Sequence, residues 1–357
     1  MKALIHGAIN RSNYGDFLFA AIFSSALKER GIDVEYYCHP KYGISDFFAR
    51  HLGYTPDRKH YKKTMESCDV LVYISGGYML SHKKLLVEYF HTKRFLPPAE
   101  YFMKSGKPIY IMGIGAGPFY KGPFARIAKE LLPYASAITF RNEESKEHCL
   151  NLGVTRDIPV TADTALVIRD YLDRNVAGVP AFEVEPGKKM LLLHTDCTQE
   201  LKSKWKEIAA PAVKKFLDSH SEYALYLASD GLAPTYDEYA PLFSEYSPHI
   251  LRYDDPWLLT MQIRRADLIL TTKLHVGILG TTFGCSVVSF PWHQKTARYY
   301  RQIGQEDRCV PLAEADEKTV LAQMERFEGK PVVVPEELVN KARKNIELLP
   351  VADDRVP

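Results

Sequence analysis

Two pairs of basic and titratable side chains follow apolar runs late in the chain, and the first pair is Lys273 and His275. They come directly after residues 267–271 (DLILT), a continuous apolar run that predicts a strand buried on both faces. Residues 276–283 contain small side chains and predict a helix that lies close to the sheet. Ligands of open α/β sheets bind at the carboxyl ends of strands, and a helix amino end favours anions. A cation and an imidazole at this junction predict a site for an anionic donor.

The second pair is His293 and Lys295, which follow the next predicted strand, residues 285–290. Taken alone, Lys273 could be a solvated lysine at the end of a strand and His275 an ordinary first-turn helix residue. The recurrence of Lys and His after two successive strands favours the binding site.

Composition bounds the class of protein. A chain of 357 residues with 46% hydrophobic residues predicts two folded domains. The formal net charge of +2 argues against a nucleic-acid-binding protein. Six scattered cysteines without a CxxC pair predict reduced thiols in a cytoplasmic protein, and Cys and His show no metal-ligand spacing. The sequence shows no signal-peptide pattern and no apolar stretch of membrane-spanning length.

Alternating predicted strands and helices fill both halves of the chain. The pattern begins with a strand at 2–6, a helix at 16–30 and a strand at 33–38, and it restarts with a strand at 189–194. Between the halves, Pro- and Gly-containing residues without periodicity predict a linker. We therefore expect two Rossmann-like domains that face each other across a cleft, at 1–170 and 189–330, with a linker at 171–188. We expect residues 331–357 to provide a C-terminal helix that could pack back on the first domain.

Glycines and one arginine follow strands of the first half. Gly76 and Gly77 come after a predicted strand at 69–74, and Gly115 and Gly117 after one at 108–112. Small residues at two strand ends predict loops in which backbone can approach a ligand or simply turn tightly.

Arg141 follows a predicted strand at 136–140. Its guanidinium could bind a carboxylate or phosphate in bidentate fashion. It could equally form a salt bridge to Glu144 or to a neighbouring loop.

Several short motifs, in this order, make the chain resemble the polysaccharide pyruvyl transferase family. They are residues 13–16 (NYGD), 75–77 (SGG), 113–118 (GIGAGP), 141–145 (RNEES), 163–165 (DTA) and 273–275 (KLH), the last followed by Lys295. The sequence departs from the family pattern at Tyr78, where the family has glycine, at Asn142, where it has aspartate, and at Lys273, where it has arginine. Lysine keeps the positive charge but lacks the planar fork of arginine.

The resemblance implies a GT-B fold with an acceptor-side first domain and a donor-side second domain. It implies transfer of pyruvate from phosphoenolpyruvate to a sugar of a cell-surface polysaccharide or of its lipid- or nucleotide-linked precursor, as a cyclic ketal. No cofactor and no metal are implied, and the partners include membrane-bound glycan machinery with which the enzyme associates peripherally. Arg141 and Lys273 are assigned to donor binding and His275 to catalysis.

Phosphoenolpyruvate carries a phosphate and a carboxylate, so its site needs several cations, and Lys295 is a third candidate. His275 is the candidate general acid, because imidazole titrates near neutral pH. Asp16 or Asp163 is the candidate base towards the sugar hydroxyl, although either could only cap a helix. The remaining candidates for substrate binding are Asn13, Gly76, Gly77, Gly115, Gly117 and His293.

Two other functions fit the same residues. A GT-B glycosyltransferase with a nucleotide-sugar donor would also place basic groups at these strand ends. A non-catalytic protein of a polysaccharide assembly complex is the third candidate, and it predicts that His275→Ala leaves polysaccharide modification intact.

Overall fold

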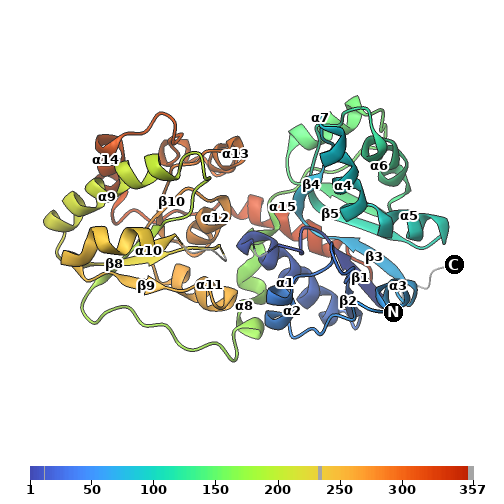
Figure 1. Ribbon diagram of the computed structural model, residues 1–357, viewed down its shortest axis with the longest axis horizontal. Helices are drawn as coiled ribbons and strands as arrows, with labels where there is room; N and C mark the ends of the chain where they lie inside the picture. The colour runs from blue at the N-terminus through green and yellow to red at the C-terminus, as the bar shows by residue number, and fades with distance from the viewer. Residues whose placement is uncertain (12, 232–234, 353–357) are drawn as a thin grey trace. The chain divides into compact units, whose positions relative to one another are not determined.

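The computed structural model describes residues 1–11, 13–231 and 235–352, which form two α/β units (Figure 1). Unit 1 comprises residues 1–171 and the C-terminal residues from 339 onward, and unit 2 comprises residues 172–338. The predicted linker at 171–188 does not stand apart from them, because helix α8 (Ile168–Asn175) runs through its first residues and the rest belongs to unit 2. Residues 331–338, predicted to belong to the C-terminal segment, also belong to unit 2.

Unit 1 contains a parallel sheet. Its strands are β1 (Lys2–His6), β2 (Asp33–Tyr36), β3 (Val70–Tyr73), β4 (Gly76–Met79), β5 (Ile109–Ala116) and β6 (Ala137–Phe140). The order is β2-β1-β3-β5, with β4 on the same side of β5 as β3 and β6 on the other side. The sheet therefore has the doubly wound arrangement that alternating strands and helices predict.

The glycines predicted to lie in loops after two strands mostly lie within strands. Gly76 and Gly77 begin β4, while Gly113 and Gly115 lie inside β5. Positive φ angles of 150° at Gly76 and 60° at Gly113 accompany irregular pairing of β5 with β4 and with β6, respectively. The prediction of loops at 76–77 and 113–116 was wrong, because glycine permits these angles while the backbone continues to pair.

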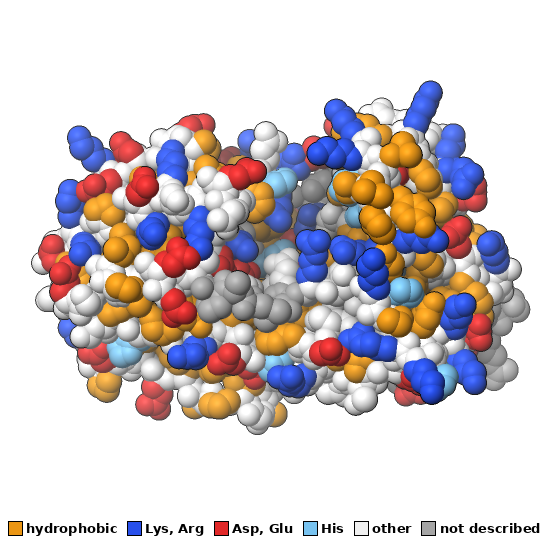
Figure 2. Space-filling model, in the orientation of Figure 1, with side chains coloured by type: hydrophobic (Ala, Val, Ile, Leu, Met, Phe, Trp, Pro, Cys, Tyr) orange, Lys and Arg blue, Asp and Glu red, His pale blue; other side chains and the backbone are white. Residues whose placement is uncertain are grey.

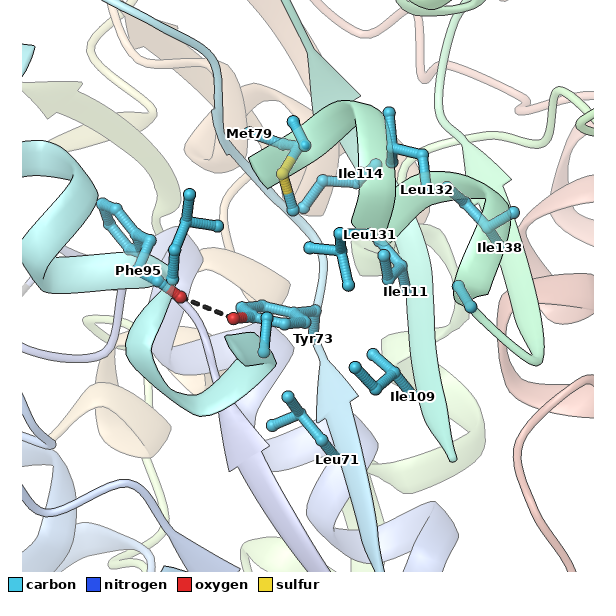
Figure 3. Close-up of a cluster of buried hydrophobic side chains, with 14 of the residues drawn as sticks. Leu71, Tyr73, Met79, Phe95, Ile109, Ile111, Ile114, Leu131, Leu132 and Ile138 are labelled. Atoms are coloured by element: carbon cyan, nitrogen blue, oxygen red, sulfur yellow. Dashed lines mark hydrogen bonds between the residues drawn. The ribbon is translucent and has the colours of Figure 1, made fainter. Parts of the chain in front are cut away.

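The helices of unit 1 connect these strands. They are α1 (Tyr14–Glu29), α2 (Asp46–His51), α3 (Tyr61–Glu66), α4 (Leu85–Phe95), α5 (Pro97–Lys104), α6 (Pro123–Tyr134), α7 (Glu143–Asn151) and the 3-10 helix η1 (Thr164–Val167). Side chains from β3, β4, β5, β6 and α6 pack into one buried cluster, shown in Figure 3. In it the Tyr73 hydroxyl donates a hydrogen bond of 2.5 Å to the Phe95 carbonyl, so this phenol is satisfied inside an apolar core.

Helix α15 (Glu336–Glu347) is fixed to unit 1 by a buried asparagine. The Asn345 side-chain oxygen accepts hydrogen bonds from Thr139 (2.6 Å) and Thr161 (2.7 Å). Its nitrogen donates to the Ala162 carbonyl (3.0 Å) and to Thr164 (2.9 Å). All the hydrogen-bonding positions of one fully buried amide are thus used at the point where the end of the chain joins the first unit.

Unit 2 contains a second parallel sheet, of order β11-β10-β7-β8-β9. Its strands are β7 (Lys189–His194), β8 (Tyr223–Ala228), β9 (His249–Leu251), β10 (Leu268–Thr271) and β11 (Ser286–Ser289). Its helical segments are α9 (Lys202–Ser219), α10 (Tyr236–Tyr239), η2 (Ala240–Tyr246), α11 (Pro256–Arg264), α12 (Leu274–Thr282), α13 (Gln294–Gln302), η3 (Glu306–Arg308) and α14 (Glu317–Phe327). Across the residues that the structure describes, no helix combines the length and apolarity needed to cross a membrane.

Helix α12 lies close to its sheet because Gly280 faces β10 and β11. A Cβ atom on Gly280 would lie 2.7 Å from side-chain atoms of both Ile269 and Val287. Gly284, with φ of 78°, follows the end of the helix. This close packing sets the place of the helix amino end, where Lys273 and His275 lie.

Candidate functional site

Arg141 is the centre of a group of candidate residues in unit 1. It directly follows β6, and its Nη1 atom lies 3.4 Å from Oδ2 of Asp163. A Cβ atom on Gly115 would lie 2.9 Å from Nη2 of Arg141, and one on Gly77 would lie 3.2 Å from it. The guanidinium therefore lies against the backbone of β4 and β5, at positions where larger side chains would displace it.

Asp163 has a structural part in this arrangement. Its Oδ1 atom accepts a hydrogen bond of 3.1 Å from the Ala165 backbone and caps η1, while Oδ2 faces Arg141. For each of these two residues the structural alternative is therefore present, since the aspartate caps a helix and the arginine forms an ion pair. The ion pair is with Asp163, and Glu144 instead lies 3.8 Å from His148.

Asn13 and Asp16 lie beside the same strand. The Asn13 amide donates a hydrogen bond of 2.7 Å to Oδ2 of Asp16, in the first turn of α1. A Cβ atom on Gly76 would lie 3.9 Å from Oδ1 of Asp16. Gly76 thus faces the aspartate, and the next residue, Gly77, faces Arg141. The carboxyl half of the unit 1 sheet brings these predicted site residues together.

Gly117 has a packing function in a different place. A Cβ atom there would lie 2.4 Å from Cβ of His148 on α7, and the φ angle is 75°. Its predicted part in substrate binding remains a prediction.

Two departures from the family pattern have clear structural explanations. Tyr78 is buried and stacked on Phe95, with ring centroids 4.7 Å apart, and its hydroxyl donates to the Ile74 carbonyl. Asn142 caps α7, because its side-chain oxygen accepts hydrogen bonds from the backbone and the hydroxyl of Ser145. Aspartate could accept the same two bonds, so the substitution by asparagine preserves the cap.

In unit 2 the predicted residues follow two adjacent strands. β10 and β11 are parallel and in register, so Lys273 with His275 and His293 with Lys295 follow the same edge of the sheet. Lys273 is the N-cap residue of α12, and His275 lies half-buried in its first turn. His293 caps α13 through Nδ1, which accepts a hydrogen bond of 3.2 Å from the Lys295 backbone.

Lys273 is held by a buried carboxylate. Its Nζ atom lies 3.2 Å from Oδ1 of Asp230, and Nε2 of His194 lies 3.5 Å from the same oxygen. Burial alone would raise the pKa of Asp230, but Lys273 and His194 hold that pKa well below its ordinary value. The Asp230 charge in turn raises the pKa of Lys273. The lysine is therefore a fixed cation at the sheet edge.

A second buried carboxylate supports this arrangement. Asp196 accepts hydrogen bonds from the Ser229 hydroxyl (2.9 Å), the Asp230 backbone (2.6 Å) and the Thr235 hydroxyl (2.9 Å). Burial raises the pKa of Asp196 and lowers the pKa of His194. These contacts fix Ser229 and Asp230, which directly follow β8.

The sequence reasoning missed His194, Asp196 and Asp230. A signal was available, because His194 ends a predicted strand at 189–194 and Asp230 lies two residues after the apolar run at 223–228 (YALYLA). Ligand atoms of the three residues lie within 4.8 Å of one another, and imidazole with two carboxylates could bind a divalent metal. The Lys273 ammonium already balances the Asp230 charge, so we assign no metal here.

A family model described as polysaccharide pyruvyl transferase matches residues 13–294. No curated protein matches the sequence. The structure resembles the UDP-GlcNAc 2-epimerase from Neisseria meningitidis bound to UDP-GlcNAc, with a TM-score of 0.62 and 12% identity over 97% of this chain and 99% of that one.

Two further solved structures show the same fold. The UDP-GlcNAc 2-epimerase from Methanocaldococcus jannaschii gives a TM-score of 0.63 and 14% identity over 97% of this chain and 99% of that one. A spinosyn rhamnosyltransferase complexed with thymidine diphosphate gives a TM-score of 0.55 and 13% identity over 97% of this chain and 95% of that one. At such low identities the similarity shows the fold alone. It confirms the predicted α/β fold of GT-B type with parallel sheets.

Proposed function

Because this chain belongs to the polysaccharide pyruvyl transferase family, we propose that it transfers pyruvate from phosphoenolpyruvate to two hydroxyls of a sugar, forming a cyclic ketal. The observation that carries the proposal is the fixed cation Lys273 beside the imidazole of His275, at the amino end of α12. An anionic donor that must be protonated during the reaction suits this pair.

The proposed reaction begins with attack of one sugar hydroxyl on C2 of phosphoenolpyruvate. The hydroxyl loses its proton to a base, and the methylene carbon gains a proton from His275 and becomes a methyl group. The C2–O bond to phosphate then breaks, and the phosphate departs with the bonding electron pair. The second hydroxyl adds to C2 and loses its proton, so that one ketal and one inorganic phosphate are formed.

Fixed charge is the part of this chemistry that the protein supplies before the substrate binds. Lys273 is positioned by Asp230, and Arg141 by Asp163 and by the glycines of β4 and β5. We assign both cations to the phosphate and carboxylate of the donor. Lys295 is assigned to the same donor.

Asp16 is the better candidate for the base. Asp163 caps η1 with one oxygen and faces Arg141 with the other, so both of its oxygens are already engaged by the protein. Asp16 is half-buried and lies beside Gly76 with Asn13 orienting one of its oxygens. We therefore assign proton removal from the sugar hydroxyl to Asp16.

Mass spectrometry of sugar acceptors incubated with phosphoenolpyruvate tests the reaction. The expected result is a mass gain of one pyruvate ketal with release of one phosphate, and loss of both in His275→Ala. His249→Ala is the matched control, because His249 is an exposed histidine of the same unit that pairs with Glu185. Glycosyl transfer from a nucleotide-sugar, with no phosphoenolpyruvate consumed, would establish the glycosyltransferase instead. Cellular pyruvylation that survives in a folded His275→Ala variant would favour a non-catalytic protein.

A further inference from the structure

Helix α4 exposes a contiguous set of large apolar side chains. We call it the α4 patch, and its residues are Leu85, Leu86, Val87, Tyr89 and Phe90. Leu85 is 85% exposed and Leu86 is 69% exposed, although both belong to a regular helix. Figure 2 shows hydrophobic side chains gathered over this part of unit 1, with basic side chains around them. Single exposed leucines are common in soluble proteins, but a contiguous apolar patch marks an interaction surface.

The helix does not need these side chains for its own packing. Its inner face is fixed by Phe95, which is buried, and by Glu88, which is 3% exposed. The Glu88 carboxylate accepts hydrogen bonds from the backbone of His82 (2.7 Å) and of Phe124 (3.2 Å). The one acidic residue of α4 is therefore turned inward, and its outer surface carries no negative charge.

Basic residues border the patch at both ends of the helix. Lys83 and Lys84 precede it and are exposed, and Lys93 lies in its last turn. The Lys93 ammonium lies 5.4 Å from the centroid of the Tyr89 ring. From a separate loop, Lys41 places its ammonium 5.1 Å from the centroid of the Phe90 ring. Cations whose stems lie along aromatic rings can keep their charge at a polar surface while the rings enter an apolar layer.

We propose that the α4 patch docks on the surface of a lipid bilayer that contains anionic lipids. Leucine, valine and aromatic side chains at the centre match the acyl and interfacial region, and the lysines match anionic headgroups. The charged side chains placed at this apolar centre, Lys83, Lys84, Lys93 and Lys41, are all basic, which favours an anionic lipid surface. The exposed helix face is too short to span the bilayer, so the contact is peripheral.

Sedimentation with vesicles tests this directly. We expect the full chain to sediment with vesicles of equal parts phosphatidylcholine and phosphatidylglycerol, and to bind pure phosphatidylcholine much more weakly. Leu85→Ser with Leu86→Ser should lower the partition coefficient by roughly tenfold or more, because each leucine contributes apolar transfer energy. Replacing Lys83 by glutamine should lower it by roughly fivefold, the factor that corresponds to about 1 kcal/mol per basic residue near an anionic surface.

Val333→Ser is the matched control, because Val333 is 81% exposed but lies in unit 2, and it should leave vesicle binding unchanged. Circular dichroism checks that each variant is folded, which is expected for substitutions at exposed positions. Equal binding to neutral and anionic vesicles, or unchanged binding in the double leucine variant, would overturn the proposal. So would a dimer in solution that the double variant converts to monomer, because the patch would then be a contact between copies of the chain. The assay needs no substrate, so its result is independent of the proposed transferase activity.

Discussion

Replacement of Asn345 by leucine should destabilise unit 1 selectively. The amide makes hydrogen bonds to Thr139, Thr161, Ala162 and Thr164, at 2.6 to 3.0 Å, and is fully buried. Leucine has a similar volume but leaves three hydroxyls and one carbonyl without this partner. At a net value of about 1 kcal/mol for each bond, the loss is about 2–5 kcal/mol of the free energy of unfolding. The lower end applies if threonine hydroxyls turn to backbone carbonyls, as Thr161 already does to Phe140.

The distribution of tryptophan makes this effect measurable in one unit at a time. Trp205, Trp257 and Trp292 are the three tryptophans of the sequence, and all lie in unit 2. Urea unfolding followed by tryptophan fluorescence therefore reports unit 2, while far-UV circular dichroism reports both units. We expect Asn345→Leu to move part of the circular dichroism transition to lower urea and to leave the fluorescence midpoint unchanged.

Asn340→Leu is the matched control on the same helix. Asn340 is exposed and bonds only the neighbouring Arg343 among the contacts described, so its replacement should change stability by less than about 0.5 kcal/mol. An Asn345→Leu variant no less stable than this control would refute the reasoning from the hydrogen-bond network. Equal shifts by both probes would show that the two units unfold together.

Three further predictions follow from other buried contacts. Gly115→Ala should displace the Arg141 guanidinium, since the new Cβ would lie 2.9 Å from Nη2, and should raise the KM for phosphoenolpyruvate by roughly tenfold in steady-state kinetics. Asp230→Asn should weaken donor binding, because Lys273 loses its positioning carboxylate. In the unchanged protein the ionised Asp230, whose pKa is depressed, stabilises unit 2 above about pH 4, and this contribution is lost as the pH falls further. The free energy of unfolding of the variant, measured by fluorescence, should therefore depend less on pH below about pH 4. Burial lowers the pKa of His6 to about 3, so below about pH 6.5 the unfolded chain binds a proton that the folded unit does not. The free energy of unfolding of unit 1 should therefore fall by about 1.4 kcal/mol per pH unit between pH 6 and 4 because of this group. His6→Phe should remove that slope in urea titrations followed by circular dichroism.

Local sequence determined the positions of most strands and helices and, with them, the class of fold. Continuous apolar runs such as those around β7 and β10 favour strands of a covered parallel sheet, and such strands occur at the predicted positions. Apolar runs of this kind also placed Lys273 after β10 and Arg141 after β6, because the end of a strand is a local property of the chain. The resemblance to a family followed from such local motifs, and the family model confirms it.

Tertiary structure decided which residues contact Lys273 and Asn345, and which face of helix α4 is buried. Asp230 meets Lys273 because β8 and β10 both neighbour β7, a pairing between segments far apart in the sequence. Asn345 enters the first unit from the other end of the chain, and only the folded chain shows what it contacts. The sequence of residues 85–95 likewise gave no indication that five apolar side chains would face outward. Hydrophobic periodicity predicts that a helix forms, but the side it buries depends on which neighbours it meets.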